Sequence, residues 1–294
     1  MLEKIKYVNN RGDTMHFGES GIYVNENDLR DWEWSFSTDY GKIRNFSRKS
    51  ASKTLPVEIW AADEESALEI KNRLHDVTTA DIVDGTPGRL YIGDYYMTCY
   101  VTASKKSNYL TSKNILSVSL KVSASSQVWY KESKFWFGDR EGLKSDIVGK
   151  AIVGYAEVGS SSSSDDSIVY DYDYPRAYET SIDARYTSVV NESLTPCEFL
   201  LEISGHAANP EIIVGNDMHR VNFTIETGQT IVVDSRDRTV KAITSSGSIN
   251  LFRYRDKTED IFKLIPPGAS NISWNGDYIF TITLYQERSE PLWT

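Results

Sequence analysis

Residues 56–101, PVEIWAADEESALEIKNRLHDVTTADIVDGTPGRLYIGDYYMTCYV, decide the fold of the first half of this chain. They predict a short apolar strand, an α-helix over residues 63–77 and a β-hairpin over residues 90–101. Asp63 suits the N-cap of the helix, because its side chain can accept a hydrogen bond from a backbone N–H of the first turn. One face of the helix is apolar and is expected to lie on a sheet. This face consists of Ala67, Ile70, Leu74 and Val77.

The end of the predicted helix and the hairpin turn follow local rules. Lys71, Arg73 and His75 fall in the expected last turn, where cations suit the negative end of the helix dipole. Gly93 and Asp94 form the expected turn between two alternating apolar segments. No group of catalytic residues gathers in this stretch, so we interpret it as a scaffold.

Length and composition limit the class of protein. A chain of 294 residues is long enough for two domains that each bury a core. Its formal net charge is -10, so a general attraction to nucleic acid is not expected. The 18 tyrosines suit β-sheet surfaces and contacts with proteins or sugars. The first ten residues show no apolar signal segment and no run reaches membrane-spanning length, so neither signal-directed export nor membrane insertion is expected.

The apolar pattern predicts a mainly β fold in two domains. Alternation lapses at residues 138–142, which we interpret as the domain boundary. Residues 1–137 are expected to form an N-terminal β-sandwich-like domain with one α-helix and a β-hairpin, and residues 138–294 a second domain. Further strands of the first domain are expected at residues 5–9, 15–24, 114–122 and 128–137.

The second half reads as a β-sandwich, because short strands recur there between regular turns. A last hairpin is expected at Asn275 and Gly276. The serine-rich run at residues 159–166 and the tyrosine–aspartate run at 170–175 lack the spacing of a calcium loop and are interpreted as a mobile loop. The expected strands are residues 197–204, 211–214, 219–225, 230–234, 240–243, 262–264, 271–274 and 278–285.

Residues 29–40, LRDWEWSFSTDY, alternate between apolar and polar side chains. Trp32, Trp34 and Phe36 would share one face of a strand. We interpret this face as part of a core, and the alternative is an aromatic ledge on which a sugar could stack.

Residues 41–53, GKIRNFSRKSASK, are basic within an acidic chain. Two interpretations remain open for this segment. It is a flexible solvated loop, or it is an arm that becomes ordered against an acidic neighbour on assembly. Its cations are Lys42, Arg44, Arg48, Lys49 and Lys53.

The sequence contains no recognisable catalytic or metal-binding pattern. Cys99 and Cys197 lie in separate apolar segments and are expected to be buried free thiols. The four histidines lack the spacing of a zinc site, and no nucleophile elbow or phosphate-binding loop is present. We therefore expect no catalytic, cofactor-binding or metal-binding residues, and the chain is not expected to be an enzyme.

Three segments of the second half form a connected pattern with its closing strand: NPEI at 209–212, GQTIVVDSRDRTV at 228–240 and IFKLIPPGASNI at 261–272. The Asp-Ser-Arg turn joins two strands into a hairpin, and the Pro-Pro-Gly run turns the chain toward its last strands. This pattern resembles the C-terminal part of phage distal tail proteins, the siphovirus-type tail component that forms a baseplate hub. The strand, helix and hairpin of residues 56–101 are similar to the N-terminal domain of that family.

The resemblance implies a structural protein at the tip of a virion tail. Its N-terminal domains would form a homohexameric ring around a channel, and its C-terminal domains would be galectin-like β-sandwiches. The implied partners are the tail-tube protein, a tail-associated hub protein and receptor-binding or baseplate proteins, with DNA only as passing cargo. Exposed hairpins suit ring closure between subunits. For subunit contacts we select the five cations of residues 42–53 and the hairpin tip Ile92, Gly93, Asp94, Tyr95 and Tyr96.

The alternative function is a carbohydrate-binding β-sandwich module that attaches to cell-wall glycan. A galectin-type site needs an H-x-N-P-R run and a W-x-x-E-x-R run. In this chain His206 lies three residues before Asn209, Glu211 occupies the arginine position, and Asn275 and Gly276 follow Trp274. The sequence therefore departs from the galectin sugar site.

Overall fold

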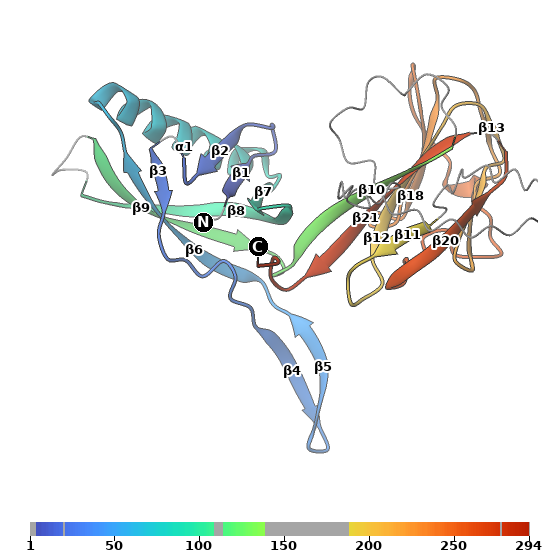
Figure 1. Ribbon diagram of the computed structural model, residues 1–294, viewed down its shortest axis with the longest axis horizontal. Coiled ribbons are helices and arrows are strands. Elements are labelled where there is room, and N and C mark those ends of the chain that lie inside the picture. The colour runs from blue at the N-terminus through green and yellow to red at the C-terminus, as the bar shows by residue number, and fades with distance from the viewer. Residues whose placement is uncertain (1–3, 20, 109–113, 139–187, 277, 294) are drawn as a thin grey trace, which may run out of the picture. The chain divides into compact units, whose positions relative to one another are not determined.

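The computed structural model describes residues 4–19, 21–108, 114–138, 188–276 and 278–293, and its fold is mainly β, as predicted. Figure 1 shows the order of the elements along the chain. The contacts divide the chain into two units, residues 1–132 with 285–294 and residues 133–284. Both β10 (Trp129–Phe137) and β21 (Ile279–Arg288) carry residues of both units. The boundary at residue 137 stays a prediction, and the sequence pattern does not indicate that the C-terminal residues return to the first unit.

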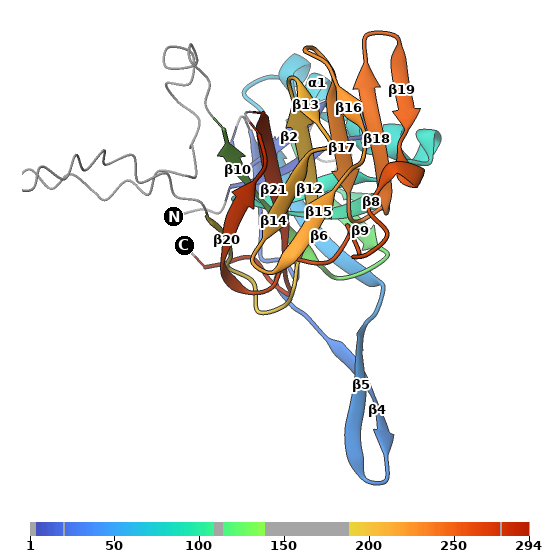
Figure 2. The same cartoon turned by 90° about the vertical axis from the view of Figure 1, so that its right-hand side faces the viewer.

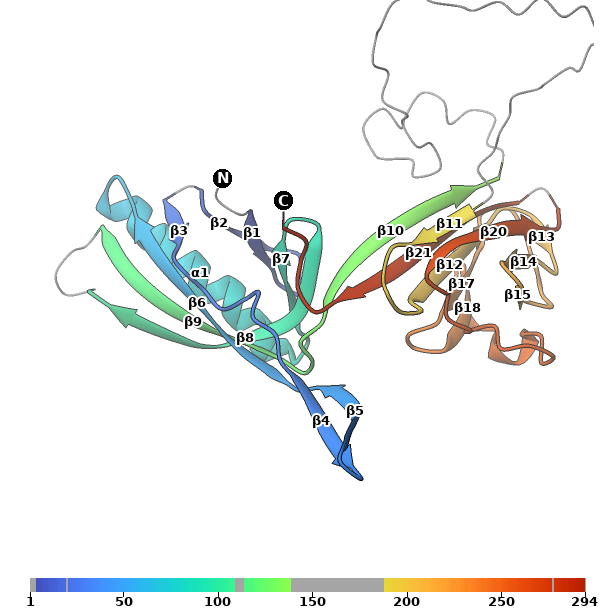
Figure 3. The same cartoon turned by 60° about the horizontal axis from the view of Figure 1, so that its bottom comes forward.

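As far as the structure describes it, the first unit consists of one helix and antiparallel strands, arranged as Figure 3 shows. Strand β8 is the centre of the unit, because its first half pairs with β7 and its second half with β9. One side of the sheet continues through β7, β1 and β2, and the other continues through β9, β6 and β3. The bounds are β1 Ile5–Val8, β2 Thr14–Phe17, β3 Ile22–Val24, β4 Trp34–Asp39, β5 Lys42–Arg48, β6 Ala51–Trp60, α1 Glu64–Asp84, β7 Gly88–Ile92, β8 Tyr95–Ser107 and β9 Ile115–Ala124.

Helix α1 begins as predicted and ends seven residues later than predicted. The Asp63 carboxylate accepts a hydrogen bond from the Ser66 N–H at 2.7 Å, which caps the first turn. The helix ends at Gly85, whose φ of 65° places it in the left-handed region. The predicted last turn with Lys71, Arg73 and His75 is wrong, and no basic residue lies in the observed last turn. The predicted apolar face ends at Val77. Thr78 and Asp81 are also buried, so the inner face of the helix extends beyond that residue.

The predicted hairpin is confirmed. Strands β7 and β8 pair from Gly88 with Cys99 to Ile92 with Tyr95, around the Gly93–Asp94 turn. Alternate residues of these strands enter a core that also receives the inner face of α1. The Trp129 side chain at the start of β10 is fully buried in the same core.

A buried polar pair connects α1 to strand β1. The Tyr7 hydroxyl donates a short hydrogen bond to the Asp81 carboxyl, and the Asn10 N–H donates to the other oxygen of that carboxyl at 2.6 Å. Gly88 lies against this pair, since a Cβ there would be 2.6 Å from the Tyr7 hydroxyl. Burial, followed by the hydrogen bond to Asp81, raises the pKa of Tyr7 far above its usual value.

In the residues that the structure describes, the second unit contains a sandwich of two antiparallel sheets, as the strand spacing predicted, and a separate two-stranded sheet of β13 and β16 (Figure 2). One sheet has the order β19-β18-β17-β12-β21, and the other has the order β11-β20-β14-β15. Side chains from both sheets form one apolar core. The galectin-like description of this unit stays a prediction. The bounds are β11 Ser188–Asn191, β12 Glu198–Ser204, β13 Ala207–Ala208, β14 Glu211–Val214, β15 Asp217–Arg220, β16 Thr224–Ile225, β17 Thr230–Asp234, β18 Thr239–Thr244, β19 Gly247–Asn250, the short helix η1 Phe252–Tyr254 and β20 Gly268–Trp274.

Three predictions for the second unit are wrong. The strand expected at residues 219–225 is broken, because β15 ends at Arg220 and β16, which begins at Thr224, pairs with β13 in a different sheet. Residues 262–264 do not form a strand. A turn precedes them, in which the Lys263 N–H donates to the Asp260 carbonyl at 2.9 Å and the Phe262 N–H donates to the Asp260 side chain at 3.1 Å. The chain turns at Asn275 and Gly276 without making a hairpin, because β20 and β21 belong to different sheets. The predicted runs at residues 139–142, 159–166 and 170–175 lie outside the described residues.

Candidate assembly surface

Strands β4 and β5 form a two-stranded ribbon that projects from the body of the first unit (Figures 1 and 3). Within the described residues, they pair with each other and with no other strand. Tyr40 and Gly41 at the tip have φ angles of 46° and 74°, as a tight type I′ hairpin turn requires. The interpretation of residues 41–53 as a flexible loop is therefore wrong, since most of them lie in β5 and β6.

The register gives the ribbon one apolar and one polar face, because cross-strand partners share a face and neighbours along a strand alternate. The alternation is interrupted once, by a register shift between the Ser35–Ser47 and Ser37–Arg44 pairs, which places Phe46 on the face opposite Arg44. Trp34 lies opposite Arg48, and the Phe36 and Phe46 rings lie 6.4 Å apart on the same face. Ile43 joins this apolar face opposite Thr38. The polar face consists of Ser35, Ser37, Asp39, Lys42, Arg44 and Ser47.

The apolar face of the ribbon is exposed. Phe36 retains 55% of its accessible surface, Phe46 retains 62%, and Tyr40 at the tip retains 98%. The prediction that Trp32, Trp34 and Phe36 pack in a core is wrong for Trp32 and Phe36, which are both more than half exposed. A two-stranded ribbon with an open apolar face is only marginally stable in water by itself. The ribbon therefore suits a protein–protein contact.

The five predicted contact cations divide into two groups. Lys42, Arg44 and Lys49 are exposed, and Arg44 lies 3.8 Å from Asp39 on the polar face. Arg48 instead contacts Glu287 at 2.8 Å and covers the Trp34 ring at 4.8 Å. Lys53 is buried and donates to the backbone oxygen of Asp31 at 2.5 Å.

The Arg48–Glu287 pair anchors the base of the ribbon. Glu287 belongs to the C-terminal residues that return to the first unit. No sequence signal could have assigned this partner, because the two residues are 239 positions apart.

The predicted contact at the β7–β8 tip has a small exposed surface. Ile92, Tyr95 and Tyr96 are buried within the protomer. The Tyr96 hydroxyl donates to a Glu132 carboxylate oxygen at 2.8 Å. Only Gly93 and Asp94 of the five selected residues are exposed.

Burial shifts the pKa values of Cys99 and His219 toward their uncharged forms. Burial raises the pKa of Cys99 to about 12, so its thiol is not a nucleophile near neutral pH. Burial lowers the pKa of His219, whose Nδ1 donates to the Ile261 carbonyl at 2.8 Å. Cys99 and Cys197 are buried free thiols, as predicted. The described residues contain no cluster of three or more metal-ligating side chains, and they include no helix long and apolar enough to cross a membrane.

The fold is similar to those of a phage baseplate protein and of a phage hub protein. A chain of the phage p2 baseplate in its activated conformation with Ca matches with a TM-score of 0.61 and 13% sequence identity, over 99% of this chain and 100% of that chain. The SPP1 Dit protein, described as a paradigm of the hub adsorption apparatus in phages that infect Gram-positive bacteria, matches with a TM-score of 0.54 and 10% identity, over 98% and 100% of the two chains. No protein-family model and no curated protein sequence matches the chain.

Proposed function

We propose that this protein is a structural hub of the tail tip of a phage or a phage-tail-like particle. Six copies form a ring that joins the tail tube to the tail-tip and receptor-binding or baseplate proteins. The observation that carries the proposal is the match of nearly the whole chain to complete chains of the p2 baseplate and of the SPP1 Dit hub protein. A match to part of the chain would leave one of the two units without a similar structure, whereas these matches cover both units.

In the proposed ring, the β4–β5 ribbon of one copy lies against its neighbour. Such a contact is heterologous, since ribbon and receiving surface differ, and heterologous contacts close into rings when the rotation allows. The apolar face with Phe36 and Phe46 becomes covered. Lys42 and Arg44 lie on the opposite face, and they contact the acidic chain, whose net charge is -10, through the ends of their long side chains at the edge of the ribbon. Gly93 and Asp94 form a second, smaller contact.

The proposed role is assembly rather than catalysis. The partners are the tail-tube protein on one side of the ring and a tail-associated hub protein on the other, with receptor-binding or baseplate proteins at the periphery. DNA passes through the channel as cargo, and the net negative charge of the chain suits passage without strong binding. The ring is built in the host cytoplasm and is found at the virion tail tip.

The first test is the mass of the purified chain in solution, measured by light scattering over a concentration series. We expect a sixfold assembly, or a monomer that becomes a ring when the tail-tube protein is added. A strict monomer that ignores tail proteins would overturn the proposal.

The ribbon contact is tested by the double variant Phe36→Ala/Phe46→Ala. Covering each half-exposed ring contributes about 1–2 kcal/mol, so losing both weakens assembly by roughly 100-fold. Phe252→Ala is the matched control, because Phe252 is also exposed and lies in the second unit. We expect this control to assemble normally. A double variant that assembles as well as the control would refute the ribbon contact.

A further inference from the structure

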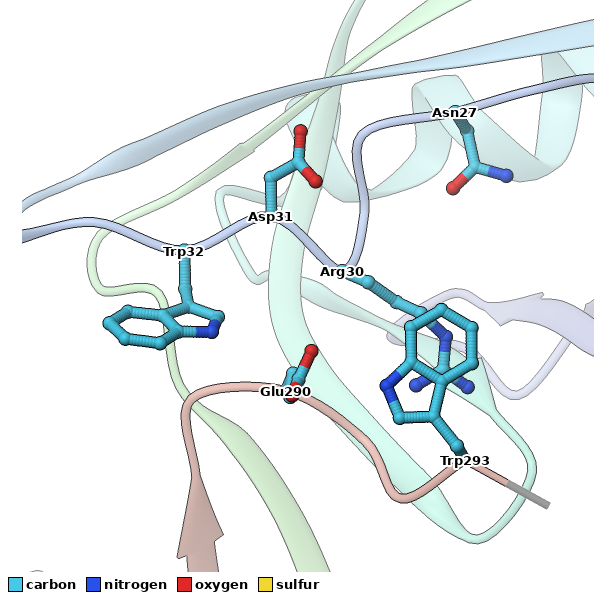
Figure 4. Close-up of a pocket in the computed structure, with 6 residues that line it drawn as sticks. All are labelled: Asn27, Arg30, Asp31, Trp32, Glu290 and Trp293. Carbon is cyan, nitrogen blue, oxygen red and sulfur yellow. The ribbon is translucent and has the colours of Figure 1, made fainter.

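An open cavity of about 550 Å³ lies in the first unit, beside the loop that precedes the ribbon. Two tryptophans and two carboxylates are prominent in its lining. Figure 4 shows Trp32 and Trp293 on opposite sides of Glu290, with the Asp31 side chain pointing away from these three residues. The lining residues are Asn27, Arg30, Asp31, Trp32, Glu290 and Trp293.

The walls of this cavity are held in place by contacts within the unit. Arg30 donates to the Pro291 carbonyl at 2.6 Å, and its guanidinium lies 4.0 Å from the centre of the Trp293 ring. These contacts tie the C-terminal segment to the loop. On the other side, the Asp31 carbonyl accepts hydrogen bonds from Lys53 and Gln127. The cavity is therefore formed before any ligand arrives.

The indole rings and carboxylates of the lining residues can contact a ligand. Trp32 is 53% exposed and Trp293 is 72% exposed. Among the described residues, neither the Asp31 nor the Glu290 carboxylate has a hydrogen-bond or ion-pair partner, so their oxygens can accept hydrogen bonds. The cavity thus offers flat apolar rings beside strong acceptors.

We infer that this cavity binds a saccharide. A sugar ring has an apolar C–H face that stacks on an indole and a rim of hydroxyls that donate to carboxylates. The volume lies within the range of ligand sites and exceeds what one amino-acid side chain needs. A purely apolar ligand would leave the Glu290 carboxylate desolvated without a partner.

A cationic ligand fits this cavity less well than a saccharide. The Arg30 guanidinium already lies over Trp293 and offsets part of the negative charge of Asp31 and Glu290. A cationic ligand stacked on the other face of the Trp293 ring would be repelled by the Arg30 guanidinium. A neutral polyol avoids this repulsion and uses the same rings and oxygens.

The inference does not depend on the hub proposal, and its test is separate from the assembly measurement. The full chain is titrated with maltotriose, cellotriose and tri-N-acetylchitotriose, and binding is followed by ligand-observed NMR. We expect saturable binding of at least one trisaccharide with a Kd of about 1 mM or tighter. Trp32→Ala and Trp293→Ala should each weaken it at least about 10-fold.

The matched control is Trp60→Ala, since Trp60 is 55% exposed in the same unit and lies outside the cavity. It should leave the affinity within about 2-fold. No binding of any of the three sugars, or an equal loss in the control, would overturn the inference. Light scattering on the two cavity variants gives a further check. A fall in assembled mass without a change in sugar binding would identify the cavity as a subunit contact and would also overturn it.

Discussion

Replacing Asp81 by alanine should destabilise the first unit, because this carboxyl joins α1 to β1 and to the turn that follows. Asp81 is fully buried. One of its oxygens accepts from the Tyr7 hydroxyl and the other from the Asn10 N–H. The variant leaves both donors without that acceptor. The remaining acceptor near the Tyr7 hydroxyl is the Cys99 carbonyl, at the long distance of 3.4 Å.

The size of the effect follows from the two hydrogen bonds that the alanine cannot make. A buried hydrogen bond to a carboxylate contributes about 1.5–3 kcal/mol, so losing two costs about 3–6 kcal/mol. Asp81→Asn should cost less, about 1–2 kcal/mol. Its amide oxygen can accept from the Asn10 N–H while its amide nitrogen donates to the Tyr7 hydroxyl, which can also accept.

Amide hydrogen exchange measured by mass spectrometry separates the two units and so suits this test. Peptides from β1, α1 and β7 should lose protection in Asp81→Ala, while peptides from β12 and β17 serve as an internal control. A loss below about 1 kcal/mol in the first unit would refute the reasoning. An equal cost for Asp81→Asn would show that charge rather than hydrogen bonding matters.

Two further predictions concern a buried histidine and a tightly packed glycine. The folded pKa of His219 lies below 6.5 through burial, so the unfolded chain binds a proton first, and stability of the second unit should fall as pH drops below 6.5. Urea unfolding between pH 7.5 and 5 should show this slope and lose it in His219→Gln, and a persistent slope would exclude His219 as the cause. Gly88→Ala should destabilise the first unit by about 1–3 kcal/mol, because its Cβ would meet the buried Tyr7 hydroxyl. Unchanged protection of β7 and β8 in exchange experiments would contradict this.

Elements that depend on local rules were predictable from the sequence. Asp63 caps α1 as expected, since N-capping needs only a side chain and the next turn of backbone. The Gly93–Asp94 turn and the strands at residues 211–214 and 230–234 also lie where the pattern placed them. Each signal comes from residues within a few positions of one another.

The alternation of residues 32–36 marks the limit of prediction from local sequence patterns. Period-2 patterning correctly put Trp34 and Phe36 on one face of a strand. It could not say whether another layer covers that face, because covering is supplied by distant segments. In this protein no described segment covers Phe36, so an apparent core face is a surface.

By itself, the sequence determined the mainly β class, the capped helix and the tight turns, because these follow from steric and hydrogen-bonding preferences of neighbouring residues. Only the tertiary structure decided that the ribbon is exposed and that Asp81 is buried against Tyr7. The tertiary structure alone also shows that the C-terminal segment packs in the first unit. There Arg48 forms an ion pair with Glu287, and the Arg30 guanidinium lies over the Trp293 ring. These contacts join residues more than 200 positions apart, so their pairing depends on how the chain folds back and not on any local pattern.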